Sequence, residues 1–290
     1  ADQVMHDQAD ELRQLVRQRA LRRVSAGPGA PLVVVGGGKE GVGTTTIAVN
    51  LAVALARQGR RAVFVEGDLD HGGTASFGLP PHEGSILDVL GGRRSLHEVL
   101  QRGPSGIQVV AGVAASQQLR DFAVPAQQRL IAELKNLAPH ADVVVIDAGS
   151  SRTVMAQRFW QSAESVMLVT TDDSLSIMDS YAAVKAMLGL ESKVPLHVLV
   201  NRPPNGAEAA GVQARIAEAC QRFLGLQAQP AGSVPICDSP AGVDGVLVYP
   251  PRSESARAMD RAAELLWVQL QQVSAQGSGN PTRPRQDASG

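Results

Sequence analysis

The stretch Pro31-Leu-Val-Val-Val-Gly-Gly-Gly-Lys-Glu-Gly-Val-Gly-Thr-Thr-Thr46 decides the fold, because it joins an apolar strand pattern to a glycine-rich loop. A helical pattern follows at residues 44–58. In such a strand–loop–helix unit, backbone N–H groups and the N-terminus of the helix cradle phosphate groups. The spacing fits G-x-x-x-x-G-K-[ST] except that Thr44 takes the place of the lysine, while Lys39 lies earlier in the loop. The stretch predicts a nucleotide-binding fold whose phosphate loop is altered.

The composition is that of a globular α/β chain. With 290 residues, 44% of them hydrophobic, the chain can bury a sizeable core in one large domain or two small ones. Aromatic residues make up only 3%, so we expect a core of Ala, Val and Leu, as in parallel sheets covered by helices. A net charge of -1 gives no general reason to expect nucleic acid or a membrane surface as a partner.

Two further observations concern location and redox state. No apolar run approaches the roughly 20 residues that span a bilayer, and no signal-peptide pattern opens the sequence, so we expect a cytoplasmic protein. Cys220 and Cys237 lie in ordinary segments, which favours two small apolar side chains over a disulfide or a zinc site.

Strand patterns and helical patterns alternate along the chain. The expected strands are Leu32–Val35, Ala62–Val65, Ile107–Val110, Asp142–Ile146, Ser165–Thr170, Leu196–Val200 and Gln229–Val234. The expected helices are 44–58, 126–137, 152–162, 174–189, 208–224 and 254–272. Near-continuous apolar strands that alternate with helices predict a three-layer α/β fold, in which a doubly wound, mostly parallel sheet carries helices on both faces.

The two ends of the chain differ from this central part. Residues 1–24 are expected to form a basic amphipathic helix, and the Gly- and Pro-rich residues 25–31 a flexible linker. The α/β domain is expected to span residues 32–273. Residues 274–290, rich in Gly, Ser, Pro and Gln, are expected to be disordered because they can bury little apolar surface.

Acidic and hydroxyl side chains complete the candidate phosphate site. Thr45 has the position whose hydroxyl ligates Mg²⁺ in phosphate loops. Asp147 ends one strand and the pair Glu66 and Asp68 ends another, and ligands bind at the carboxyl ends of parallel strands. We therefore expect Thr45, Glu66 and Asp147 to hold Mg²⁺; the alternative is that the acids are only solvated loop charges. The expected phosphate-binding residues are Gly38, Lys39, Glu40, Gly41, Val42, Gly43, Thr44, Thr45 and Thr46.

The loop resembles that of a known family. Lys39, within G-K-x-G-x-G, is similar to the signature lysine of the MinD/ParA class, the P-loop ATPases with a deviant Walker A motif. Val65-Glu-Gly-Asp-Leu-Asp70 resembles that family's I-D-x-D-L, so the resemblance implies catalytic roles for Asp68, which would position the attacking water, and for Lys39. It also implies that Asn201 and Arg202 bind adenine. Pro235-Ile-Cys-Asp238 is similar to the I-P-x-D step of the family.

Two segments narrow the resemblance to the FlhG (FleN, YlxH) branch. The run from Thr170 to Lys185, T-T-D-D-S-L-S-I-M-D-S-Y-A-A-V-K, is similar to T-T-P-E-P-T-S-I-T-D-A-Y-A-L-I-K of that branch. Asp7-Gln-Ala-Asp-Glu-Leu-Arg13 matches its D-Q-A-x-x-L-R motif, which there binds the GTPase FlhF and stimulates GTP hydrolysis. The alternative is that this helix packs on its own domain or on a membrane. The resemblance implies partner-activating roles for Asp7, Gln8, Ala9, Leu12 and Arg13.

Three residues depart from the family pattern. Thr44 removes a lysine from the β- and γ-phosphates, and a charged hydrogen bond of that kind contributes about 1.5–3 kcal/mol. We therefore expect weakened binding of ATP or ADP with Mg²⁺, and weak or lost hydrolysis. Glu40 replaces a glycine and brings a negative charge toward the phosphates and a partner subunit, whereas Glu66 in place of aspartate is a milder change. In a competing interpretation, Lys39 folds back onto its own phosphates and restores modest affinity.

These observations lead to one preferred function and two alternatives. The preferred one is an FlhG-like regulator of flagellar number or placement, which acts on an FlhF-like GTPase at the cell pole or flagellar base. A homodimer and contacts with the flagellar C-ring or a transcription regulator stay open, as does the question of whether the chain is an enzyme. Membrane contact is not expected, because residues 255–270 have the pattern of a core helix.

The first alternative is an active MinD/ParA-type switch that dimerises with ATP and serves cell division, polar positioning or chromosome partition. The second is a DNA-binding partition protein. It is not favoured, because only the N-terminal helix is basic and nucleic acid binding asks for a basic surface.

Overall fold

The computed structural model of the chain describes residues 29–68, 84–112, 123–150, 152–190, 192–237 and 248–277, without the side chains of residues 274, 276 and 277. The expected N-terminal helix and its motif at residues 7–13 lie outside the described residues. The same holds for most of the expected linker and for residues 278–290 of the expected tail.

The described residues form an α/β domain around one eight-stranded sheet. The strands, in their order across the sheet, are β3 (Leu100–Arg102), β4 (Gln108–Val110), β2 (Ala62–Glu66), β5 (Val143–Asp147), β1 (Leu32–Gly37), β6 (Ser165–Thr170), β7 (Leu196–Asn201) and β8 (Ala228–Val234). Only β3 and β4 pair antiparallel, and all other neighbours are parallel. The predicted doubly wound, mostly parallel sheet is confirmed, with β3 as an edge strand that the sequence patterns do not predict.

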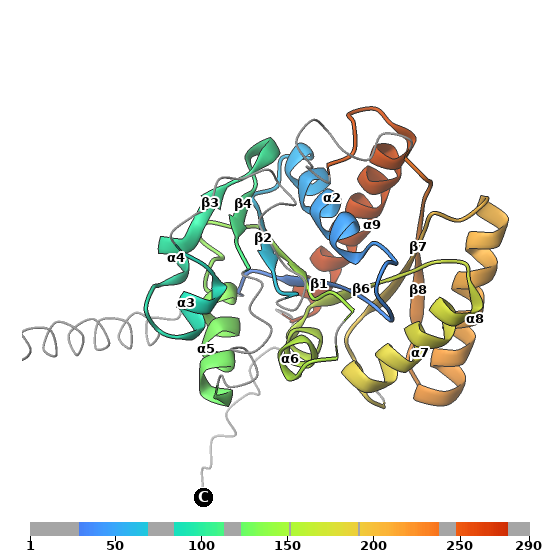
Figure 1. Cartoon of the computed structure of the whole chain (residues 1–290), viewed down its shortest axis with the longest axis horizontal. Coiled ribbons are helices and arrows are strands. Elements are labelled where there is room, and N and C mark those ends of the chain that lie inside the picture. The colour runs from blue at the N-terminus through green and yellow to red at the C-terminus, as the bar shows by residue number, and fades with distance from the viewer. Residues whose placement is uncertain are drawn as a thin grey trace, which may run out of the picture.

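Helices cover both faces of the sheet (Figure 1). On one face, α2 (Thr44–Arg57) and α9 (Glu254–Gly277) pack side by side. The other described helices belong to the opposite layer: α3 (Ile86–Leu90), α4 (Leu96–Val99), α5 (Val124–Lys135), α6 (Val154–Ser162), α7 (Ser174–Leu188) and α8 (Gly206–Leu224). A short 3₁₀ turn, η2 (Pro104–Gly106), joins β3 to β4.

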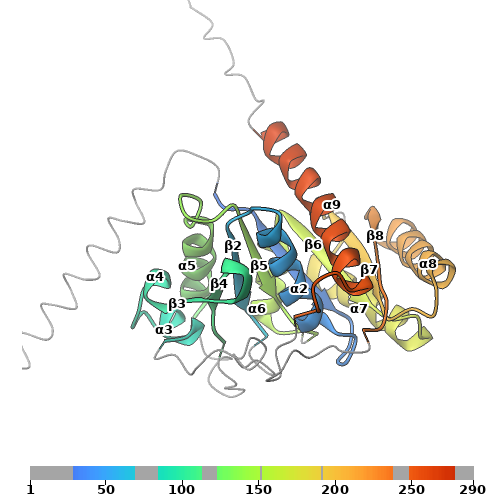
Figure 2. The ribbon, with the colours of Figure 1, turned by 90° about the horizontal axis from the view of Figure 1, so that it is seen from above.

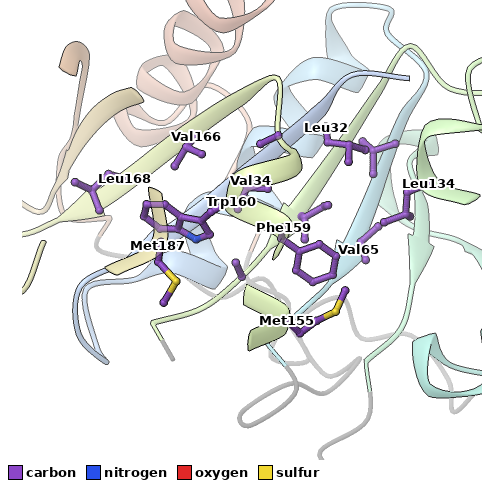
Figure 3. Close-up of a cluster of buried hydrophobic side chains, with 14 of the residues drawn as sticks. Leu32, Val34, Val65, Leu134, Met155, Phe159, Trp160, Val166, Leu168 and Met187 are labelled. Carbon is purple, nitrogen blue, oxygen red and sulfur yellow. The ribbon is translucent and has the colours of Figure 1, made fainter. Parts of the chain in front are cut away.

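The core has two layers, one on each side of the sheet. Consecutive residues of a strand point to opposite faces, so Val34 of β1 belongs to one apolar cluster and Val33 to the other. Aliphatic side chains dominate both clusters, and Figure 3 shows Phe159 and Trp160 of α6 packed among them. The indole of Trp160 occupies the place of a Cβ on Gly36, so β1 needs glycine at that position.

The last helix carries the apolar cluster that the sequence assigns to the core. Leu266 and Leu270 of α9 are buried against the sheet, and Trp267 packs beside them under the guanidinium group of Arg60. Val268 points away and is 48% exposed. The last turns of α9 project beyond the sheet (Figure 2). Within the described ranges, no helix combines the length and the apolar character needed to cross a membrane.

Three neighbouring strands end at the same place. In the order of the sheet, β5 lies between β2 and β1, and the register pairs Asp147 with both Glu66 and Val35. Because these strands are parallel, the acids that end β2 and β5 lie at the same edge of the sheet as the loop after β1. The fold therefore brings together the residues that the sequence predicts to form one site.

Candidate functional site

The phosphate loop consists of residues 38–43, between β1 and α2. Gly41 and Gly43 have left-handed φ angles of 80° and 93°, a conformation that favours glycine. Gly43 is also the N-cap of α2, and no side chain caps the helix there. The first N–H groups of α2 have no partner within the helix, so together with the helix dipole they can bind an anion. The backbone geometry of the loop suits a phosphate group.

Two glycines of the loop allow neighbouring elements to come close. A Cβ on Gly38 would overlap the backbone of Asp179 and Ser180 in α7. A Cβ on Gly43 would overlap the side-chain amide of Asn201, at the end of β7. The loop is therefore packed against α7 on one side and against the end of β7 on the other.

Thr44 lies where a phosphate loop normally has its lysine. Thr44 is only 6% exposed. Its hydroxyl oxygen is so close to β1 that a Cβ on Gly37 would lie 2.7 Å away. The side chain thus points back toward the end of β1 and brings no charge to the loop. The next residue, Thr45, is half-buried, and its hydroxyl lowers the pKa of the Asp147 carboxyl.

Asp147 is the most deeply buried acid of the site, with 1% of the residue exposed. Its Oδ1 accepts the N–H of Gly149 at 3.1 Å. Its Oδ2 is buried and has no hydrogen-bond partner among the described residues. Burial raises the pKa of Asp147 to about 7, and the negative charges of Asp68 and Glu66 add to the rise, against the opposing bonds from Thr45 and Gly149. A cation beside Oδ2 would favour the charged carboxylate.

Glu66 and Asp68 lie beside Asp147. Glu66 Oε2 accepts the N–H of Gly112 at 2.9 Å, and the carboxylate of Asp68 occupies the place of a Cβ on Gly149, whose φ is 62°. Within the described residues, no group of three or more acidic, His or Cys side chains is arranged to hold a metal ion by itself. Mg²⁺ keeps several waters and binds through one or two carboxylates together with substrate phosphates. Thr45, Asp147 and the neighbouring acids fit Mg²⁺ that arrives with a nucleotide.

Lys39 points to helix α7 rather than onto its own loop. Its Nζ lies 3.0 Å from Oδ1 of Asp173, which is the N-cap of α7 and also accepts the N–H of Ser176 at 3.0 Å. Hydrogen bonds from the hydroxyls of Ser176 and Thr171, with further help from Lys39, hold the pKa of Asp173 well below its usual range. In this geometry Asp173 neutralises the charge of Lys39, and the structure does not place Lys39 over the phosphate position of its own loop.

Asn201 and Arg202, the residues expected to bind adenine, both touch the phosphate loop. Asn201 is 3% exposed and its Nδ2 donates to the carbonyl of Val42 at 2.8 Å. Arg202 is exposed, has a left-handed φ of 57°, and donates from Nη2 to the carbonyl of Gly41 at 2.5 Å. The sequence places both residues at the site but gives no sign of these loop contacts.

Two further residues join the site without having been predicted. Asp173 precedes a helical pattern, and Asp at that position is a typical N-cap signal, so the sequence could have indicated its role in α7 but not its bond to Lys39. Asn50 of α2 donates to the carbonyl of Thr46 at 2.7 Å and accepts the N–H of Tyr249 at 2.7 Å. It thereby ties the first turn of α2 to the segment before α9.

The remaining predicted site residues fall into two groups. Glu40 is exposed on the loop. The residues of the partner motif lie outside the described residues; these are Asp7, Gln8, Ala9, Leu12 and Arg13.

Residues 31–186 match the family model described as an AAA domain. The antiactivator FleN of Pseudomonas aeruginosa is 32% identical over 212 residues, which cover 72% of this chain and 74% of FleN. The flagellum site-determining protein YlxH of Helicobacter pylori is 25% identical over 188 residues, which cover 63% of this chain and 62% of YlxH.

Solved structures of MinD proteins have a fold similar to that of this chain. The septum site-determining protein MinD of Pyrococcus horikoshii, complexed with Mg-ADP, has a TM-score of 0.66 at 21% identity, covering 81% of this chain and 95% of MinD. The cell division ATPase MinD of Pyrococcus furiosus has a TM-score of 0.65 at 23% identity, covering 82% of this chain and 99% of that one. Together with the similarity to FleN and YlxH, these matches identify the chain as a member of the FlhG branch of the MinD/ParA P-loop ATPases.

Proposed function

We propose that this chain is a nucleotide-binding regulator of flagellar number or placement that acts on an FlhF-type GTPase through residues 7–13. The observation that carries the proposal is the 32% identity to the antiactivator FleN over 74% of that protein. The similarity to the flagellum site-determining protein YlxH supports the same process. The partner motif Asp7-Gln-Ala-Asp-Glu-Leu-Arg13, which precedes the domain, adds the class of partner.

In this proposal the phosphate loop binds ADP or ATP together with Mg²⁺. The left-handed Gly41 and Gly43 shape the loop, and the uncapped N-terminus of α2 supplies N–H groups for a phosphate. Thr45 and Asp147 would hold Mg²⁺, which neutralises charge on phosphate oxygens when it is bound. The family includes MinD of Pyrococcus horikoshii, whose structure is a complex with Mg-ADP.

Weak or lost hydrolysis is the second part of the proposal. Thr44 is neutral and turned toward Gly37, and Lys39 is engaged by Asp173, so neither supplies the positive charge that stabilises phosphoryl transfer. Loss of one charged hydrogen bond lowers nucleotide affinity by about 10- to 150-fold. Asp68 remains in place at 6% exposure to orient a water molecule. In this proposal the chain keeps the acid that orients water but has no lysine side chain directed at the phosphates of its own loop.

The partner role is tested with the FlhF-type GTPase from the same organism. We expect the full chain and a peptide of residues 1–23 to stimulate GTP turnover, because residues 1–24 are proposed to be the activating helix and residues 32–273 the nucleotide-binding domain. Gln8→Ala in the full chain should abolish most of the stimulation, whereas Gln18→Ala, outside the motif but on the same segment, should preserve it. Absence of stimulation by both the chain and the peptide would disprove the partner role.

An ATP-dependent dimerising switch of the MinD/ParA type is the second candidate. It is favoured by the retention of Thr45 in the first turn of α2, of Asp68 two residues after β2, and of Asp147 at the end of β5. Light scattering with and without Mg-ATP measures dimerisation, and steady-state phosphate release measures turnover. Dimer formation together with turnover that is lost in Asp68→Asn would favour this candidate over a regulator with weak or absent hydrolysis. Both candidates are compatible with localisation at a cell pole or flagellar base, so localisation does not distinguish them.

A further inference from the structure

Asn201 and Arg202 hold the phosphate loop from its outer side. Asn201 Nδ2 bonds the carbonyl of Val42 at 2.8 Å, and Arg202 Nη2 bonds the carbonyl of Gly41 at 2.5 Å. The bonded residues are 159 and 161 positions apart in the chain, so both contacts exist only in the folded domain. The Asn201 bond is buried, which shields it from competition by water.

These two bonds fix the direction of two peptide planes in the loop. In a trans peptide, the C=O of one residue and the N–H of the next point in opposite directions, and no described peptide bond is cis. With its carbonyl held by Arg202, Gly41 therefore directs the N–H of Val42 away from Arg202. The bond from Asn201 directs the N–H of Gly43 away in the same manner. No hydrogen bond among the described residues uses either N–H as a donor.

The backbone that carries the two side chains is itself held in place. Arg202 has a left-handed φ of 57°, and its own N–H donates to the carbonyl of Val234 in β8 at 2.7 Å. On the loop side, Gly43 leaves room for the amide of Asn201 because it has no Cβ. The ends of β7 and β8 thus determine where the two side chains meet the loop.

We propose that Asn201 and Arg202 are positioning residues that order the phosphate loop for polyphosphate, in addition to any contact with a base. The inference rests on the proposed nucleotide binding at this loop. Since Thr44 brings no charge, the oriented N–H groups of Val42 and Gly43 carry a larger part of the phosphate binding than in a loop with lysine. Asn201 can serve both roles, because its Oδ1 is buried and without a partner among the described residues, and so remains for a donor on the ligand.

Tripolyphosphate separates the two roles because it has no base. Calorimetric titrations would compare the full chain with Asn201→Ala and Arg202→Ala, using Mg-ADP and Mg-tripolyphosphate as ligands. Loop positioning predicts that each variant binds both ligands about two- to tenfold more weakly, the effect of losing one hydrogen bond. Arg215→Ala, which removes an exposed arginine from α8, is the control for charge and should keep both affinities. Loss for ADP alone, with tripolyphosphate affinity kept in both variants, would mean a base contact only and would overturn the proposal.

A measurement without ligand tests the same inference independently. Amide ¹⁵N relaxation of the full chain gives order parameters for Gly41, Val42 and Gly43, which we expect near the rigid-backbone value of about 0.85 and lower in both variants. If the unmodified chain binds neither ligand, the proposed nucleotide binding fails, and these order parameters still decide whether the loop is held. Unchanged order parameters in both variants would overturn the proposal. Because Arg202 is exposed, Arg202→Ala carries the test even if Asn201→Ala does not fold.

Discussion

At the scale of single residues, Thr44, Lys39 and Asp147 determine the charge at and beside the phosphate loop. Thr44 contributes none, and Lys39 shares its charge with Asp173 at 3.0 Å. Burial raises the pKa of Asp147 to about 7, so this carboxyl keeps its proton to higher pH than an exposed aspartate does. The sequence identifies all three positions through their spacing. It does not indicate their partners, since these come from residues that are distant in the chain.

Restoring the loop consensus should restore affinity. Thr44→Lys combined with Glu40→Gly returns a permanent cation and removes a negative charge, and we expect Mg-ADP affinity to rise at least tenfold, about 1.4 kcal/mol. Calorimetry measures the change. Thr44→Val, which keeps the shape and adds no charge, is the control and should leave affinity unimproved. An unchanged affinity in the double variant would show that these two residues do not limit binding.

Asp147 should make the stability of the domain depend on pH in a definite direction. Its pKa is about 7 in the folded state and near 3.9 when unfolded, so the folded state binds more protons in between and stability falls as pH rises from about 4 to 7. Asp147→Asn removes this loss. We therefore expect the difference in free energy of unfolding, variant minus unmodified chain, to increase with pH. The increase should be up to about 1.4 kcal/mol per pH unit and should level off above pH 7.

Urea unfolding between pH 4.5 and 8 measures that difference. Asp88→Asn is the control. Burial raises the pKa of Asp88, but hydrogen bonds from Arg93 and Ser85 outweigh burial and lower it. The contribution of Asp88 to stability therefore changes only below about pH 5. A flat difference for Asp147→Asn across the whole range would contradict a raised pKa at this carboxyl.

At the scale of elements, the sequence predicts what is long and periodic. Strands β1, β2, β5, β6 and β7 are buried along their whole length and therefore appear as near-continuous apolar runs, with polar residues mostly at their ends. The short elements are missed: α3 has five residues, α4 has four and β3 has three, too few to display a period. Their signals are local instead. Ser85 and Ser95 each begin a capping box, a pattern that indicates the start of a helix even where the helix is too short to show a period.

The contact between the loop and α7 can be tested by adding one methyl group. Gly38→Ala would push a Cβ into the backbone of Asp179 and Ser180, and backbone cannot turn aside as a flexible side chain can. We expect the free energy of unfolding to fall by about 1–3 kcal/mol and nucleotide affinity to fall with it. Gly206→Ala is the matched control, because a Cβ at the first residue of α8 meets nothing within 4 Å. Equal stability of the two variants would contradict the packing of the loop against α7.

At the scale of the whole molecule, the described core consists of two apolar clusters, one on each face of the sheet. Both apolar clusters are built from residues between Ala30 and Leu270. Alternating strands and helices are enough to predict this architecture, since parallel strands need covered faces. What the pattern cannot give is the set of tertiary bonds at the site, such as Asn201 to Val42, because they depend on how distant strand ends meet.

Removal of residues 1–28 should separate two properties. We expect the shortened chain to unfold at nearly the same temperature, because residues 1–24 are proposed to be an activating helix separate from the nucleotide-binding domain. We also expect it to lose stimulation of the FlhF-type GTPase. Calorimetry and GTP turnover measure the two effects. The full chain with Gln8→Ala serves as the control that keeps the segment and loses the motif. A large drop in unfolding temperature would instead support the alternative that the segment packs on its own domain.

The close packing of Gly38 against α7 has a thermodynamic consequence for the outer surface of the molecule. The helix that contacts Gly38 also carries Leu175, 57% exposed, and Met178, 69% exposed. If covering these two side chains changes the affinity of the loop for its anion by some factor, then the anion changes the affinity of that second site by the same factor, because the coupling free energy is reciprocal. With such a coupling, a titration performed at either place reports on events at the other.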